Sequence, residues 1–151
     1  FCERILPVGG DNFTEIRATL RKVHQVPLPD DPNHVGYDNQ AHRAAFLAFL
    51  KFLKGNLSGQ TSTRVDPTWA TQSVLLQGFA EFGLPDHILR ESSLQRDLRL
   101  IGVCIGRADV PTPATYEDSR LRAIYDRELE TAARDAYARD YVGFGFGDWD
   151  A

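Results

Sequence analysis

The chain has 151 residues, of which 42% are hydrophobic, 25% charged and 11% aromatic. This composition excludes an intrinsically disordered chain, because such a chain lacks the apolar surface that offsets the entropy lost on folding. A formal net charge of -4 excludes a broad nucleic-acid surface, which needs clustered excess Lys and Arg. No apolar run approaches the roughly 20 residues of a membrane-spanning helix. We therefore expect a soluble, cytoplasmic protein with one domain over residues 1–151.

The first residue is Phe1 and the chain contains no Met, which is typical of a piece of a longer product. Two cysteines, Cys2 and Cys104, are too few for a disulfide framework or a metal site. Neither has the basic sequence neighbours of a reactive thiolate, and the apolar context of Cys104 predicts a packing role. The histidines are too scattered to predict a metal site; they are His24, His34, His42 and His87.

Asn12 followed by Glu15 forms a capping pair, which predicts a helix as far as about His24. Its apolar face repeats at helical spacing over Phe13, Ile16, Leu20 and Val23. Residues 26–39 are predicted to be a long loop, because three prolines remove amide donors and the Asp and Asn residues between them favour turns. Loops of this length in compact domains are often functional.

A second helix is predicted over residues 40–54, with Gly55 ending it. Its apolar face consists of Ala45, Phe46, Phe49, Leu50 and Leu53. Residues 55–64 are rich in glycine and hydroxyl side chains and predict a polar loop. The apolar run over residues 74–76 is compatible with a helix end or a buried strand, and its periodicity does not decide between them.

Residues 87–90 are short, partly β-branched and bounded by turn formers, which predicts a strand. Ser92 or Ser93 then begins a helix whose inward positions are Leu94, Leu98, Ile101 and Cys104. A last helix is predicted from Asp118 to Tyr141, because apolar residues recur every three or four positions. Phe144, Phe146 and Trp149 form an aromatic tail that we expect to fold back onto the core.

The segment from Lys54 to Arg64 contains two cations, four hydroxyls and two glycines, which is suitable chemistry for binding an anion. The candidate anion-binding side chains are Lys54, Thr61, Ser62 and Arg64. The segment lacks the phosphate-loop pattern, and a solvated loop after a helix end is the simpler interpretation. His34 lies in the long loop, where it is a candidate general base toward a substrate hydroxyl or an ordinary exposed histidine.

Acidic residues crowd the start of the last predicted helix, where interleaved arginines favour surface ion pairs over a carboxylate active site. They are Glu117, Asp118, Asp126, Glu128 and Glu130. Tyr125, Tyr137 and Tyr141 fall at helical spacing, which favours a core stripe over a stacking platform.

Three ordered segments resemble the Golgi-type and bacterial carbohydrate sulfotransferases, the sulfotransferase family 2 group. The first is Trp69-Ala70-Thr71-Gln72, although Thr68 and Thr71 stand where the family has His and Pro. The second runs from Asp86 through Glu91 to the Asp97-Leu98 pair. The third combines the run from Tyr125 to Leu129 with the run from Tyr137 to Phe146. Together they span most of residues 66–146.

This resemblance implies an α/β fold, of which the chain is the helix-rich C-terminal part of a P-loop-like sulfotransferase fold with few short strands. It implies transfer of a sulfuryl group from 3'-phosphoadenosine 5'-phosphosulfate to a carbohydrate hydroxyl. The family's donor-binding loop is absent from these 151 residues. Residues 1–5 are a candidate continuation of the family's 3'-phosphate element just beyond its Arg, with Arg4 as a candidate donor contact and Glu3 standing where a Ser is expected. Acceptor contacts are expected from the 26–39 loop, and donor-side contacts from the 54–64 loop.

Two alternatives stay open. The first is a noncatalytic binding or structural subunit that keeps the sulfotransferase-like scaffold. The second is a generic helical domain, which predicts no strand near residues 87–90. Activity as an enzyme depends on whether the full-length protein carries the donor-binding loop, because sulfuryl transfer works mainly through positioning and cations.

Overall fold

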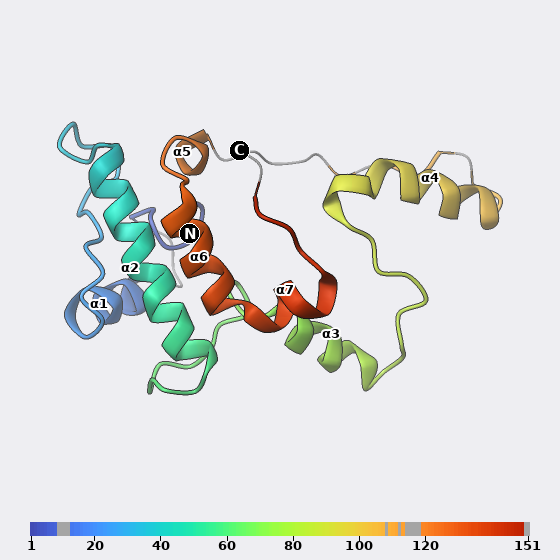
Figure 1. Cartoon of the computed structure of the whole chain (residues 1–151), viewed down its shortest axis with the longest axis horizontal. Coiled ribbons are helices and arrows are strands. Elements are labelled where there is room, and N and C mark those ends of the chain that lie inside the picture. The colour runs from blue at the N-terminus through green and yellow to red at the C-terminus, as the bar shows by residue number, and fades with distance from the viewer. Residues whose placement is uncertain (9–12, 108, 112, 114–118, 150–151) are drawn as a thin grey trace. The chain divides into compact units, whose positions relative to one another are not determined.

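The computed structural model describes residues 1–8, 13–107, 109–111, 113 and 119–149. All regular structure in these residues is helical, so the helix-rich expectation is confirmed, whereas no strand is present in these ranges (Figure 1). No helix among the described residues is both long and apolar enough to cross a membrane. The helices are α1 Thr14–Lys22, α2 Asn39–Leu57, α3 Gln72–Ala80, the 3-10 helix η1 Glu91–Ser93, α4 Leu94–Cys104, α5 Ser119–Arg122, α6 Arg127–Ala136 and α7 Ala138–Phe144.

The chain divides into two compact units. The first combines Phe1–Gln77 with Asp118–Ala151, and the second is Gly78–Glu117. Helix α3 begins in the first unit and ends in the second. It resolves the open choice at residues 74–76 in favour of a helix. The assignment of residues 1–151 to one domain stays a prediction.

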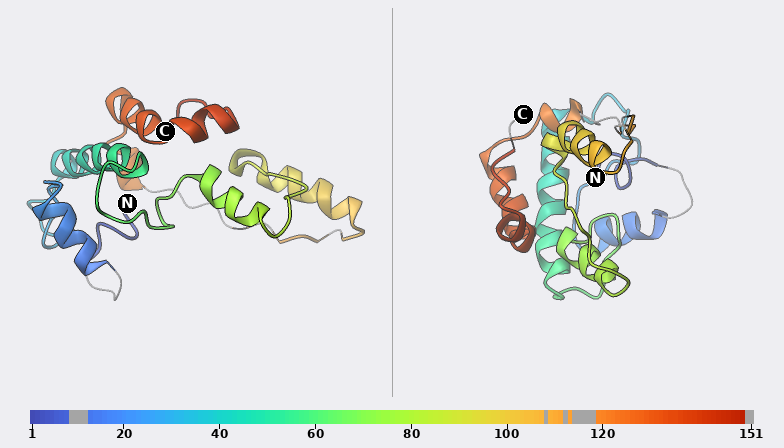
Figure 2. Two further views of the ribbon diagram at one scale, coloured as in Figure 1. Left: turned by 90° about the horizontal axis from the view of Figure 1, so that it is seen from below. Right: turned by 90° about the vertical axis from the view of Figure 1, so that its right-hand side faces the viewer.

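The core of the first unit is built around α2 and α6, which lie side by side (Figure 2). The predicted apolar face of α2 is confirmed, since Ala45, Phe49, Leu50 and Leu53 are buried and Phe46 packs half-buried against them. Helix α6 contributes Leu129, which is fully buried. This pairing follows from the hydrophobic effect, because each helix has one apolar stripe to remove from water.

Helix α2 passes through Gly55, so the predicted end at this residue is wrong. The helix ends at Leu57, and Gly59 then takes a left-handed conformation with φ of 71°. Glycine adopts this conformation without steric cost, which makes Gly59 the position that turns the chain. Helix α1 confirms the first predicted helix, whereas its expected cap Asn12 lies outside the described residues.

The last predicted helix is not continuous. It is divided into α5, α6 and α7. The break before α6 arises because Asp126 takes an extended conformation and caps α6 with its side chain, and the break between α6 and α7 lies at Tyr137. The Asp126 carboxylate accepts hydrogen bonds from the amides of Glu128 and Leu129, both at 3.0 Å. An Asp competes well for free amides at a helix start, and this capping interrupts the helix although the apolar periodicity of the sequence continues.

The strand predicted at residues 87–90 is wrong, because these residues have no regular structure. This is the outcome expected of a generic helical domain. In α4, the predicted inward positions Leu94, Leu98 and Ile101 are half-buried. Cys104 is exposed, so its predicted packing role is wrong. Gly102 is the buried position of α4 instead, because the Arg107 carbonyl would lie 2.4 Å from an added Cβ.

A buried hydrogen-bond network centred on Asn56 fixes the 55–64 loop to the core. The Trp69 indole donates to Asn56 Oδ1 at 2.9 Å. The Asn56 amide nitrogen in turn donates to Thr61 Oγ1 at 2.9 Å and to the Thr63 carbonyl at 2.6 Å. Asn56 is only 2% exposed, so water cannot replace these partners.

Replacing Asn56 by Ala leaves the buried Trp69 indole N–H without an acceptor. We expect Asn56→Ala to lower the free energy of unfolding by about 3 kcal/mol, measured by urea denaturation. Gln60→Ala in the same exposed loop is the matched control and should change stability by less than about 0.5 kcal/mol. Equal stabilities of the two variants would refute the role of the network.

The Asp126 cap makes the stability of the fold sensitive to acid. The Leu129 amide, followed by the Arg43 guanidinium, holds the pKa of Asp126 below its ordinary value of about 4. The carboxylate therefore stabilises the folded state above about pH 4, and this contribution is lost as the pH falls through the lowered folded-state pKa. Thermal melts at pH 7, 4 and 2.5 should show a difference between wild type and Asp126→Asn that shrinks with falling pH. The exposed-residue control Glu3→Gln should follow wild type throughout, and a constant Asp126→Asn difference would contradict the assignment.

Candidate functional site

The long proline-containing loop forms one wall of a polar cavity of about 270 Å³. Arg17 of α1 fixes this loop, donating hydrogen bonds to the Leu6 and Pro29 carbonyls, both at 2.7 Å. Arg120 of α5 donates to Asn33 Oδ1 at 3.0 Å from the other side. The cavity is lined by Pro32, Asn33, His34, Val35, Tyr37, Asp38, Asn39, His42 and Arg120.

His34 lies in this polar cavity, and its Nδ1 accepts a hydrogen bond from the Gly36 amide at 3.0 Å. A neutral imidazole with Nδ1 as acceptor carries its proton on Nε2. The nitrogen able to take a proton is therefore occupied by the loop's own backbone. Its role as a general base stays a prediction, and it requires the His34 ring to leave this hydrogen bond.

His42 is a buried histidine that the sequence did not single out. Its Nδ1 lies 3.0 Å from the Tyr37 hydroxyl, and its Nε2 lies 3.6 Å from Cys2 Sγ. Burial, with a smaller contribution from Cys2, raises the pKa of Tyr37 to about 12. Sequence reasoning missed this cluster because its members lie up to 40 residues apart.

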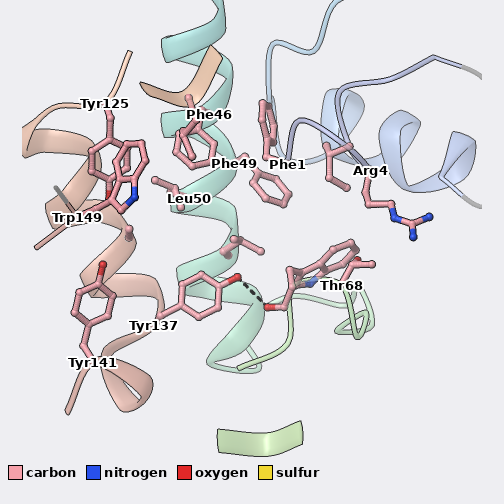
Figure 3. Close-up of a pocket in the computed structure, with 15 residues that line it drawn as sticks. Phe1, Arg4, Phe46, Phe49, Leu50, Thr68, Tyr125, Tyr137, Tyr141 and Trp149 are labelled. Carbon is pink, nitrogen blue, oxygen red and sulfur yellow. Dashed lines mark hydrogen bonds between the residues drawn. The ribbon is translucent and has the colours of Figure 1, made fainter. Parts of the chain in front are cut away.

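A second, mainly apolar cavity of about 350 Å³ lies between α2 and the C-terminal helices (Figure 3). The three tyrosines predicted as a core stripe line it, and each is half-buried. The Tyr125 and Trp149 rings meet at 4.3 Å, and the Trp149 amide donates to Glu130 at 3.2 Å. Trp149 of the aromatic tail therefore folds back onto the first unit, as predicted for the tail, whereas this packing of Phe144 and Phe146 on the core stays a prediction. Burial, with the Glu130 carboxylate second, raises the pKa of Tyr125.

The predicted donor-binding residues have different surroundings. Arg4 borders the apolar cavity, but its exposed guanidinium points away from Phe46 and Phe49 (Figure 3). Lys54 is paired with Asp135 at 2.7 Å on the surface of the first unit.

Within the polar loop, Thr61 accepts the Asn56 hydrogen bond. Ser62 and Arg64 are exposed, and their side chains have no hydrogen bond or ion pair among the described residues. The donor-binding role of all five residues stays a prediction.

The acidic residues of the last predicted helix have structural roles where they are described. Arg43 of α2 lies 2.7 Å from Asp126 and 2.5 Å from Glu128, linking α2 to the start of α6. Glu117 and Asp118 lie outside the described residues. Among the described residues, no group of three or more His, Cys, Asp or Glu side chains is arranged to hold a metal ion.

The two outer segments of the resemblance contact each other. The Tyr137 hydroxyl donates to the Trp69 carbonyl at 3.0 Å (Figure 3). Asp140, which is 3% exposed, accepts hydrogen bonds from the Gln72 amide at 2.7 Å and the Ser73 amide at 3.0 Å. The carboxylate thus satisfies the free amides at the start of α3.

No protein-family model, curated protein or solved structure matches this chain in comparisons with known proteins.

The contact between these two segments can be tested at Asp140. In Asp140→Ala, two amides at the start of α3 lose the buried carboxylate that accepts their hydrogen bonds, so we expect a loss of about 3 kcal/mol in the free energy of unfolding. Asp135→Ala removes only the exposed ion pair to Lys54 and should cost less than about 1 kcal/mol. Urea denaturation of both variants measures the difference. A loss at Asp140 no larger than that at Asp135 would show that the contact is dispensable.

Proposed function

We propose that this chain is the C-terminal part of a P-loop-like sulfotransferase that contributes the acceptor side of a sulfuryl-transfer site. The donor is 3'-phosphoadenosine 5'-phosphosulfate, and the acceptor is a carbohydrate hydroxyl. The observation that carries the proposal is the hydrogen bonding of Trp69 and Gln72 to Tyr137 and Asp140. Residues from the first and the third segments that resemble the family are thus hydrogen-bonded to each other.

The polar cavity is the proposed acceptor site. The 26–39 loop, from which acceptor contacts were expected, supplies most of its lining. Asn33, Asp38 and Asn39 offer amide and carboxylate groups of the kind that bind sugar hydroxyls. Its volume of about 270 Å³ is at the small end for ligand cavities, which favours a single sugar ring over an extended chain.

Charge in and near this cavity suits a reaction that transfers an anionic group. Arg120 lines the cavity, and both Arg120 and Arg17 interact electrostatically with Tyr37. Cationic side chains that are already held in position when the reaction starts stabilise the negative charge on a transferred sulfuryl group. The acceptor hydroxyl must lose a proton, for which His34 is the candidate base once its Nδ1 releases the Gly36 amide.

On the donor side, Ser62 and Arg64 are the exposed candidates for phosphate contact. A guanidinium and a hydroxyl on one loop can bind a phosphate by charge-assisted hydrogen bonds. The donor-binding loop itself must come from sequence outside these 151 residues. Its chemistry would be a Lys, Ser and Thr loop that binds the 5'-phosphosulfate.

The alternative is a noncatalytic subunit on the same scaffold. It is favoured by the two donor candidates that serve the fold instead, since Lys54 is paired with Asp135 and Thr61 accepts from Asn56. Such a chain keeps the packing residues of an enzyme, but its candidate ligand-binding side chains bond to the protein itself. It would retain a binding surface and would not catalyse sulfuryl transfer.

Calorimetry of the full-length protein with 3'-phosphoadenosine 5'-phosphate separates these two functions. The enzyme should release heat at micromolar ligand, and Arg64→Ala should weaken binding about tenfold through loss of a charge-assisted hydrogen bond. Lys51→Ala removes an exposed cation on α2 outside the loop and is the matched control. An absence of heat at high micromolar ligand would overturn the enzyme and leave the noncatalytic subunit.

A further inference from the structure

Cys2, His42 and Tyr37 form a line of three polar side chains drawn from the N-terminal segment, α2 and the long loop. Cys2 Sγ lies 3.6 Å from His42 Nε2, and the Tyr37 hydroxyl lies 3.0 Å from His42 Nδ1. A thiol, an imidazole and a group that orients the imidazole, in this order, are the parts of an activated nucleophile. Sulfur accepts and donates weak hydrogen bonds at this longer distance.

The surroundings hold the imidazole in place, and the Cys2 residue beside it is partly exposed. His42 is 3% exposed and packs against the Phe1 ring, with ring centroids 5.8 Å apart. Cys2 is half-buried. His42 and Tyr37 also line the polar cavity of about 270 Å³, so the cluster borders space that a small ligand can enter.

Charged groups of both signs lie near the Tyr37 end of the cluster. Arg17 and Arg120 both interact electrostatically with Tyr37. Asp38 is an anion in the lining of the same cavity, where its carboxylate accepts the Ala41 amide at 2.9 Å and caps α2. A histidine beside the thiol is one of the surroundings in which cysteines react.

We propose that Cys2 is an activated thiol and a modification site for small hydroperoxides. His42 takes the thiol proton on Nε2, and Tyr37 is the positioning residue that accepts a hydrogen bond from Nδ1–H. The proposal is independent of sulfuryl transfer, because it rests on the Cys2–His42 geometry and needs no donor site.

The reaction balances without a further reagent. The Cys2 thiolate attacks one oxygen of the hydroperoxide, an S–O bond forms and the O–O bond breaks. The leaving alkoxide or hydroxide takes the proton held by the His42 imidazolium and departs as alcohol or water. Sulfur is oxidised by two electrons to the sulfenic acid, and the hydroperoxide is reduced.

Cys104 provides an internal control in the same molecule. It lies at the end of α4 and is exposed, so it is more accessible than the half-buried Cys2. Among the described residues, Cys104 has no hydrogen-bonded histidine. Exposure alone therefore predicts that Cys104 reacts faster, and activation by His42 predicts the reverse.

The test is alkylation of the folded chain with iodoacetamide at pH 6, followed by mass spectrometry of both cysteine peptides. At this pH an ordinary thiol is almost fully protonated, so we expect Cys2 to react about tenfold faster than Cys104. One equivalent of hydrogen peroxide with dimedone should label Cys2 and spare Cys104. Alkylation of Cys2 at or below the Cys104 rate overturns the activation, and missing dimedone label overturns the hydroperoxide reaction.

Variants assign the activation to His42. In His42→Gln the Cys2 rate should fall about tenfold while the Cys104 rate is unchanged, with folding checked by thermal melting. If that variant does not fold, Tyr37→Phe takes its place, because it removes only the positioning hydroxyl and should slow Cys2 about threefold. An unchanged Cys2 rate in the folded variant overturns the role of the histidine.

Discussion

The structure of the first unit depends on the hydrogen bond from the buried Trp69 indole to Asn56. An indole N–H placed in an apolar core needs an acceptor, and Asn56 supplies it from within α2. The same amide holds the 55–64 loop, while the Trp69 carbonyl accepts from Tyr137. The Trp69 ring also packs edge-on against Phe49 and Phe52 of α2. Trp69 and Asn56 together therefore connect α2, the polar loop and the end of α6.

In the first unit, the polar groups that stabilise the fold around Trp69 lie apart from the polar cavity. Around Trp69 the polar groups are paired with one another and form a rigid support. The polar cavity lies by the long loop instead, which Arg17 ties to the N-terminal segment through backbone carbonyls. A buried guanidinium that donates to backbone carbonyls of both segments orders two irregular segments at once. The loop can then present Tyr37 to His42 without regular structure of its own.

The features that follow from local sequence could be predicted. The apolar face of α2 and the proline-rich loop each depend on spacing or on single-residue backbone preferences. The break before α6 could not, because the helical periodicity continues through Asp126 and only its cap geometry interrupts the helix. The pairing of Cys2 with His42 was also out of reach, since no local pattern indicates a contact across 40 residues. Clusters that form only when the chain folds cannot be predicted from the spacing of residues along the sequence.

The absence of a strand at residues 87–90 has a physical cause. A strand exists only with a partner that takes up its backbone hydrogen bonds, and a parallel partner comes from a distant part of the chain. The described residues of the second unit contain no such partner, and they leave Phe82 and Leu84 92% and 81% exposed. Such exposure is expected of a segment whose burial depends on contacts outside itself. Residues 87–90 have neither a neighbouring strand to accept their backbone hydrogen bonds nor a core to pack against. β propensity alone therefore could not form the strand.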